Sequence, residues 1–258
     1  MKIQYEYSDA MKNLLRSFYL ALSFLTRIPV PLKGDISQQE IAQSMLFYPA
    51  VGLLIGIILW LIIHILLFVS SAFPPGVIAA IELTVWVLLT GGLHLDGLAD
   101  SADAWIGGQN NRIRTLEIMK DPYCGPIGVT IIMLLLLIKW SSLSFLLKTG
   151  HSAFILVIPM LSRSMILVLF MSTEYVRENG LGAVFMEELP DDKALWTVLI
   201  VALLLSLILT GWWSIILMSG VIYGLRILMI KRLGGMTGDT IGASVEIAEA
   251  AALIGLLF

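Results

Sequence analysis

The chain has 258 residues, of which 58% are hydrophobic and only 14% are charged, and its mean hydropathy is +0.92. Soluble domains are about 25% charged and about 45–50% apolar, so this composition excludes an ordinary water-soluble globule and a disordered chain. The net charge of -3 leaves no basic surface for a polyanion, which excludes a nucleic-acid-binding protein. A single cysteine, Cys124, excludes an intramolecular disulfide and a cysteine-based zinc site. We therefore expect an integral membrane protein whose main partner is the lipid bilayer.

The first element expected is an apolar segment at 14–30. It is short, carries Arg16 and Arg27 and ends in two prolines, so it suits an interfacial or re-entrant helix better than a membrane span. The charged residues before it show no basic-then-apolar order, and we expect no cleaved signal peptide. Residues 1–44 are thus predicted to form a cytoplasmic or interfacial N-terminal segment.

Seven later segments are apolar over the roughly 20 residues that a helix needs to cross a bilayer. They lie near 45–70, 77–94, 127–148, 152–172, 195–210, 212–230 and 241–258. The break between the fifth and the sixth, at Gly211-Trp212-Trp213, suits a tight hairpin with an aromatic anchor. The expected fold is all-α: a polytopic integral membrane helical bundle of about seven transmembrane helices, one domain over 1–258 with its bundle at 45–258.

The basic residues are distributed asymmetrically along this topology. If the N-terminus is cytoplasmic, then 12 of the 16 Lys and Arg residues lie in the cytoplasmic segments 1–44, 95–126, 173–194 and 231–240. The connections on the opposite side are short and hold none. The positive-inside rule therefore predicts a multi-pass protein of the cytoplasmic (inner) membrane, with its active site facing the cytoplasm.

Three aspartates at the inner end of the second span form the strongest chemical signal. Asp96, Asp100 and Asp103 are spaced i, i+4 and i+7, which places them on one face of a helix. Two carboxylates about 6 Å apart repel by about 3 kcal/mol at an effective dielectric near 20, so this spacing favours a bound cation. Oxygen ligands favour Mg²⁺ or Mn²⁺, and Mg²⁺ commonly combines one or two carboxylates with substrate phosphates. The alternative is a solvated acidic helix end. His94, just before them, is a candidate base or orienting group.

Two further groups extend the candidate site. Lys120 and Asp121 precede a Pro/Gly-rich turn, which suits either a phosphate-binding loop or an ordinary charged loop. Asp239 and Glu246 are seven residues apart on the last helix and would share a face directed at the aspartate helix. Their alternative roles are an N-cap and an acid that snorkels to the interface.

Three isolated charges, Glu82, Lys139 and Arg163, lie within the expected spans. Arg163 is near the middle of its helix and should pair inside the bundle with a carboxylate or an anionic ligand. For Lys139 and Glu82 we expect structural pairing. Arg27 either binds a phosphate or anchors its helix at the interface.

Several catalytic motifs are absent: the Walker A sequence, HExxH, GxSxG and GxGxxG after a strand. P-loop hydrolysis, zincin proteolysis, serine hydrolysis and Rossmann cofactor binding therefore lose their sequence support. Clustered aspartates with Mg²⁺ and nearby bases instead suit phosphoryl transfer from a substrate activated by a nucleoside diphosphate.

Four strings, in the right order over about residues 14–258, resemble the cobalamin synthase family. They are Phe24-Leu25-Thr26-Arg27-Ile28-Pro29-Val30-Pro31, Gly91-Gly92-Leu93-His94-Leu95-Asp96-Gly97-Leu98-Ala99-Asp100-Ser101-Ala102-Asp103, Glu117-Ile118-Met119-Lys120-Asp121 and Gly234-Gly235-Met236-Thr237-Gly238-Asp239-Thr240-Ile241-Gly242-Ala243. The resemblance implies an adenosylcobinamide-GDP ribazoletransferase, in which α-ribazole or its 5′-phosphate attacks adenosylcobinamide-GDP and releases GMP with Mg²⁺. This reaction is the last step of nucleotide loop assembly in coenzyme B12. The resemblance does not decide between a monomer and a homo-oligomer.

The resemblance also implies roles for individual residues. Asp96, Asp100 and Asp103 would be catalytic ligands of the metal or pyrophosphate, with His94 as base or orienting group. The substrate-binding residues expected from the resemblance and from the isolated charges together are Arg27, Lys120, Asp121, Arg163, Asp239 and Glu246. Where the family usually continues with Ser-Arg after Lys120-Asp121, this chain has Pro122-Tyr123. Arg163 or Arg112 would then have to supply the phosphate contact of that arginine.

A cation transporter with a cytoplasmic-side carboxylate site is the alternative from another functional class. Its ion path would distribute acids through the bilayer and usually shows a repeated broken helix. The acids of this chain cluster toward one face instead, and no repeat is found, so we favour the transferase.

Overall fold

The computed structural model describes residues 2–70, 72–178, 180–210 and 212–258, and these residues form helices but no strand. The first helices are α1 (Lys2–Leu25), α2 (Gln38–Ser44), η1 (Met45–Phe47), α3 (Tyr48–Val69), α4 (Pro75–Thr90), α5 (Leu93–Gly107) and α6 (Arg112–Ile118). They are followed by α7 (Pro126–Lys148), η2 (Ser152–Leu156), α8 (Ile158–Ser172), α9 (Leu181–Glu187), α10 (Asp192–Thr210), α11 (Trp212–Leu233) and α12 (Gly238–Gly255). The all-α fold expected from the sequence is confirmed. The hairpin expected at Gly211 lies outside the described residues.

Four of the described helical segments are long and apolar enough to cross a membrane. They are Gln38–Val69, Pro126–Lys148, Ser152–Ser172 and Trp212–Leu233. A fifth crossing arises only if α4 and α5, which are bent by 88° against each other, count as one broken span. By this test the described residues support fewer crossings than the seven expected. Two physical reasons are clear: α5 turns away from the direction of α4, and α12 carries three acidic residues in 18.

Two consecutive glycines produce the bend between α4 and α5. Gly91 and Gly92 have φ angles of +66° and +69°, a left-handed conformation that other residues rarely adopt. Gly91 ends α4 and Gly92 begins α5. The sequence therefore places the aspartate helix across the end of α4 instead of continuing it.

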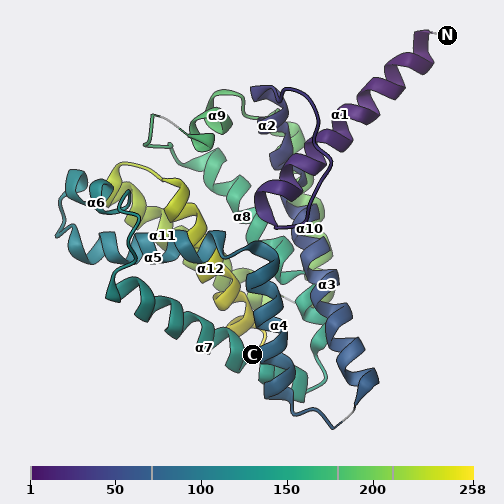
Figure 1. Cartoon of the computed structure of the whole chain (residues 1–258), viewed down its shortest axis with the longest axis vertical. Coiled ribbons are helices and arrows are strands. Elements are labelled where there is room, and N and C mark those ends of the chain that lie inside the picture. Colours follow the sequence, from purple (N-terminus) through teal and green to yellow (C-terminus); the bar gives the residue numbers. More distant parts are fainter. Residues whose placement is uncertain (1, 71, 179, 211) are drawn as a thin grey trace.

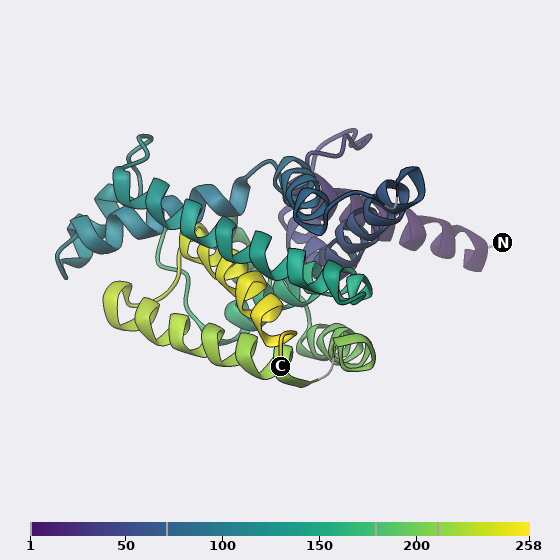
Figure 2. The same cartoon turned by 90° about the horizontal axis from the view of Figure 1, so that it is seen from below.

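The functional segments gather in one part of the molecule. Figure 1 shows α5 and α6 at the left, and α2 and α9 above them, whereas the end of α3 and the start of α4 lie at the bottom. Seen from below, α12 runs between α7 and α11, and α1 projects away from the other helices (Figure 2). Helix α12 thus forms the centre around which the other helices are arranged.

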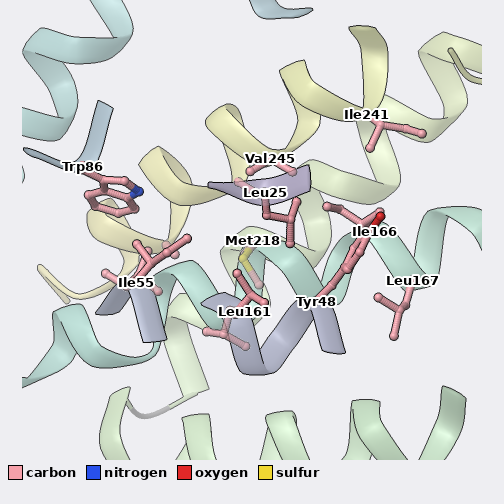
Figure 3. Packing of buried hydrophobic residues seen from close by; sticks show 14 of the residues in the cluster. Leu25, Tyr48, Ile55, Trp86, Leu161, Ile166, Leu167, Met218, Ile241 and Val245 are labelled. Atoms are coloured by element: carbon pink, nitrogen blue, oxygen red, sulfur yellow. The ribbon is translucent and has the colours of Figure 1, made fainter. Parts of the chain in front are cut away.

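The core joins helices that are far apart in sequence. Figure 3 shows Leu25, Tyr48, Leu161, Met218 and Val245 close together, contributed by α1, α3, α8, α11 and α12. In the candidate span that contains α8, 72% of the most apolar stretch is buried inside the protein. In the other three candidate spans this share is only 22–33%. We infer that α8 is an interior helix, and that the exposed apolar side chains of the outer spans face lipid.

Candidate active site

The site begins where α5 and α12 touch. A methyl group at Gly97 would lie 2.7 Å from the Asp239 carbonyl oxygen, and one at Gly242 would lie 3.3 Å from the His94 Cα atom. The close approach of the two helices therefore requires glycine at position 97, and a side chain at position 242 would force a small shift. Asp96 lies in the first turn of α5, and Asp239 lies in the first turn of α12. Two helix N-termini, which favour negative charge, thus meet at one place.

The carboxylates at this junction repel one another. Asp100 is half-buried and faces the negative charges of Asp96, Asp239 and Asp103, in that order of strength. Among the described residues, no three His, Cys, Asp or Glu side chains are arranged to hold a metal ion by themselves. The described acids thus form no preformed metal cage, and a Mg²⁺ ion shared with substrate phosphates stays a prediction.

Asp103 has a structural contact that the sequence did not predict. Its two carboxylate oxygens accept hydrogen bonds from the backbone N–H groups of Gly125 at 2.7 Å and Gly128 at 3.0 Å. Gly125 is the N-cap of α7, so the Asp103 carboxylate satisfies N–H groups that have no partner inside the helix. This contact holds the loop with Lys120 and Asp121 against the end of α5.

Arg177 belongs to the site although the sequence analysis counted it only as one of the cytoplasmic bases. Its guanidinium lies 2.5 Å from the Asp239 carboxylate. Backbone hydrogen bonds from Val176 N–H to Met236 and from Met236 N–H to Glu174 join this segment to the start of α12. No local motif indicates that Arg177 pairs with Asp239, because the two residues are about 60 positions apart in the sequence.

Tyr175, in the same segment, also lies at the site. Burial raises the pKa of its phenol, and the positive charge of Arg177 opposes that shift. Its hydroxyl therefore stays protonated and can donate a hydrogen bond at neutral pH.

Two of the predicted substrate-binding residues lie instead in a buried network of ion pairs. Lys139 Nζ is 2.6 Å from Glu246 and 2.5 Å from Glu249, and Arg163 pairs with Glu249. The expected pairing of Lys139, and of Arg163 with a carboxylate, is confirmed. The partner of Arg163 is Glu249, which the sequence analysis did not name as its partner. Glu246 faces Lys139 and does not join Asp239 at the helix junction.

The pairing expected for Glu82 is wrong. This side chain is fully buried, and neither carboxylate oxygen has a hydrogen-bond partner among the described residues. It lies beside His151 in a very small cavity.

The remaining predicted residues surround the junction. The Arg27 N–H donates to the Leu89 carbonyl, and its side chain covers Gly91 at the α4–α5 bend. Lys120 and Asp121 are exposed, and the Asp121 carboxylate accepts a hydrogen bond from the Tyr123 N–H at 3.0 Å. Their contact with a phosphate stays a prediction.

A cavity of about 240 Å³ opens beside the junction. His94, Asp96 and Asp239 line it on the side of α5 and α12, and aromatic rings line much of the rest. The His94 side chain is buried, and its Nδ1 atom has no hydrogen-bond partner among the described residues. A substrate in this cavity would meet the His94 side chain and the two carboxylates of Asp96 and Asp239.

The chain matches known proteins over nearly its whole length. The family described as cobalamin-5-phosphate synthase matches residues 17–257. Relatives named adenosylcobinamide-GDP ribazoletransferase include those of Pseudomonas entomophila (strain L48) and Pseudomonas putida (strain W619). Each is 49% identical over 242 residues, which are 93% of this chain and 97% of the relative. A relative of the same name from Acinetobacter baumannii is 47% identical, over 90% of this chain and 93% of its own length. No solved structure matches the chain. The family match and these identities show that the chain belongs to the cobalamin-5-phosphate synthase family.

Proposed function

We propose that this protein is an adenosylcobinamide-GDP ribazoletransferase. It joins adenosylcobinamide-GDP and α-ribazole, or the 5′-phosphate of α-ribazole, and releases GMP. The family match and the names of the relatives support this activity. The transporter alternative draws no support from either.

The observation that carries the proposal is that Asp96 and Asp239 lie in the first turns of two helices that meet, and that Asp100, one turn further along α5, faces both of them. Four carboxylates, Asp103 included, would repel a pyrophosphate unless a cation lay between them. We propose that Asp96 and Asp100 hold Mg²⁺ together with the substrate phosphates, and that Asp103 remains mainly the cap of α7. When bound, the ion would neutralise charge on the phosphates and on the leaving GMP. Arg177, and Lys120 from the neighbouring loop, supply positive charge beside it.

The chain's own residues orient the nucleophile and receive its proton. The 3′ hydroxyl of the ribose attacks the phosphate nearest to cobinamide, and the bond between the two phosphates breaks as GMP leaves. We assign the proton of that hydroxyl to His94, because this side chain lines the cavity beside Asp96 and its Nδ1 atom has no hydrogen-bond partner among the described residues. The apolar rings around it exclude water, which protects the activated substrate from hydrolysis.

Purified full-length protein tests this activity directly. We expect GMP release that requires both adenosylcobinamide-GDP and α-ribazole, stops on addition of EDTA and returns with Mg²⁺. The variant His94→Gln should lower kcat by about 100-fold or more, while leaving the binding of both substrates intact. Release of GMP without α-ribazole, or activity that EDTA does not change, would contradict the proposal. A flux of Mg²⁺ into proteoliposomes without GMP release would favour the transporter.

We further propose that the protein lies in the inner membrane and that this site is on the cytoplasmic side. The single cysteine provides the measurement, because Cys124 is exposed in the loop that contacts Asp103. A membrane-impermeant maleimide should label inverted vesicles and should leave intact spheroplasts unlabelled. In a Cys124→Ser variant that also carries Ser70→Cys, at the other end of the bundle, the labelling should reverse. Labelling of Cys124 in spheroplasts would place the site on the outer side.

A further inference from the structure

Aromatic rings line the cavity beside the contact of α5 and α12. Phe24, Tyr48, Phe170, Tyr175 and Phe185 all line it, although aromatic residues make up only 9% of the chain. They come from α1, α3, α8, the segment after α8, and α9. None of the rings comes from the two helices that carry the aspartates. The cavity thus has an acidic side and an aromatic side that are built by different parts of the chain.

The rings form a connected set. Phe24 stacks on Tyr48 with centroids 6.1 Å apart, and Phe170 stacks on Tyr175 at 6.5 Å. Phe185 meets Phe24, Tyr48 and Phe170 edge to face, at 6.1, 6.1 and 5.6 Å. Stacked and edge-to-face contacts are the two arrangements in which such rings attract a further planar ring. The set therefore suits a flat aromatic group.

The size of the cavity limits what that group can be. An apolar cavity of about 150 Å³ is enough to bind benzene, so a cavity of about 240 Å³ has room for a fused two-ring base. Whole drug-sized ligands occupy about 300–1,000 Å³. A corrinoid or a complete nucleotide does not fit within the aromatic part.

The polar groups of the lining distinguish between two bases. On the aromatic side, the hydroxyl of the buried Tyr48 makes no hydrogen bond of normal geometry, and the neighbouring Ser44 donates its own proton to the Ile41 carbonyl. The Tyr48 ring extends toward Ile166, another residue of the lining (Figure 3). A benzimidazole riboside has one free ring nitrogen, which accepts one hydrogen bond. Guanine has several donors and acceptors on its edge, and burying them unpaired is costly.

We infer that this cavity binds the benzimidazole base of the acceptor nucleoside, with the base between the aromatic rings and the ribose directed at His94 and Asp96. The Tyr48 hydroxyl donates to the free ring nitrogen. This inference rests on the proposed function, because it assigns one of the two substrates to a part of the same site. Two larger cavities, of about 310 and about 500 Å³, are lined mainly by apolar groups, and none of the carboxylates lines them.

Two variants of the full chain in detergent test the assignment. Phe185→Leu removes a ring but keeps an apolar side chain, and Tyr48→Phe removes only the hydroxyl. Each should raise the Kd and the KM for α-ribazole about threefold to tenfold, and should leave the KM for adenosylcobinamide-GDP unchanged. The matched control is Phe154→Leu, which alters a ring stacked on His151 outside the cavity and should change neither KM.

The outcomes separate the inference from the proposed function. The Kd for α-ribazole is measured by calorimetry without the second substrate, so it needs no turnover. If both variants weaken α-ribazole binding, the assignment holds even if the wild-type protein releases no GMP. If the KM for adenosylcobinamide-GDP rises while the Kd for α-ribazole is unchanged, guanine occupies the cavity and the inference is overturned. Unchanged values for both substrates overturn it as well.

Discussion

Replacing Asp100 by asparagine is expected to lower kcat for GMP release by at least about 100-fold, the loss typical of removing one electrostatic contact to a transferring group. The same variant should not lower the thermal stability of the metal-free protein. Asp100 faces three other carboxylates, so the neutral amide removes repulsion in the folded state. Asp96→Asn should behave in the same way. The measurement is GMP release beside a melting curve in detergent, and wild-type rates in both variants would remove these residues from the site.

Asp103 provides the contrast to this result. Asp103→Ala leaves the N–H groups of Gly125 and Gly128 without their acceptor, and should cost about 1–2 kcal/mol of stability, the usual loss for a helix N-cap. Asp103→Asn keeps one acceptor oxygen and should lose less. If Asp103→Ala melts like the wild type but releases no GMP, then Asp103 is a ligand in the site and its capping role is minor.

The second large effect is expected at Glu249, in the buried network. Glu249→Gln leaves Arg163 and Lys139 with Glu246 as the remaining carboxylate of the network, and should destabilise the protein by about 3–5 kcal/mol. The measurement is the shift of the thermal midpoint in detergent.

The control makes the same chemical change on the surface. Glu117 pairs with Arg114 at 3.4 Å, with both side chains more than half exposed, and Glu117→Gln should change stability by less than about 1 kcal/mol. The double variant Arg163→Met with Glu249→Met removes a complete ion pair and leaves Lys139 with Glu246. It should recover most of the loss, and an equally unstable double variant would show that charge balance is not the cause.

The apolar spans and the aspartate face were predictable because both follow from local periodicity. Hydropathy located α3, α7, α8 and α11. The spacing of Asp96 and Asp100 predicted that their two carboxylates lie close to each other. The isolated position of Arg163 in an apolar helix was enough to require a buried partner.

Other features depend on contacts between distant segments, which single-sequence patterns do not contain. The cap that Asp103 forms on α7 needs Gly125 and Gly128, more than 20 residues later. Arg177 reaches Asp239 through a backbone pairing of two irregular segments. The seven-residue spacing predicted that Asp239 and Glu246 share one helix face. It could not show that Glu246 forms an ion pair with Lys139 on another helix.

The contact at Gly97 and Gly242 has a consequence for altering this protein. The acidic side of the cavity is positioned by main-chain atoms that leave no room for a side chain at Gly97 and little room at Gly242, so side-chain size there cannot be varied freely. The opposite side consists of aromatic rings on segments that hold none of the aspartates. Selection for a different base, in the laboratory or in nature, should therefore accumulate its substitutions at Phe24, Phe170 and Phe185, while the chemistry of the transfer stays the same.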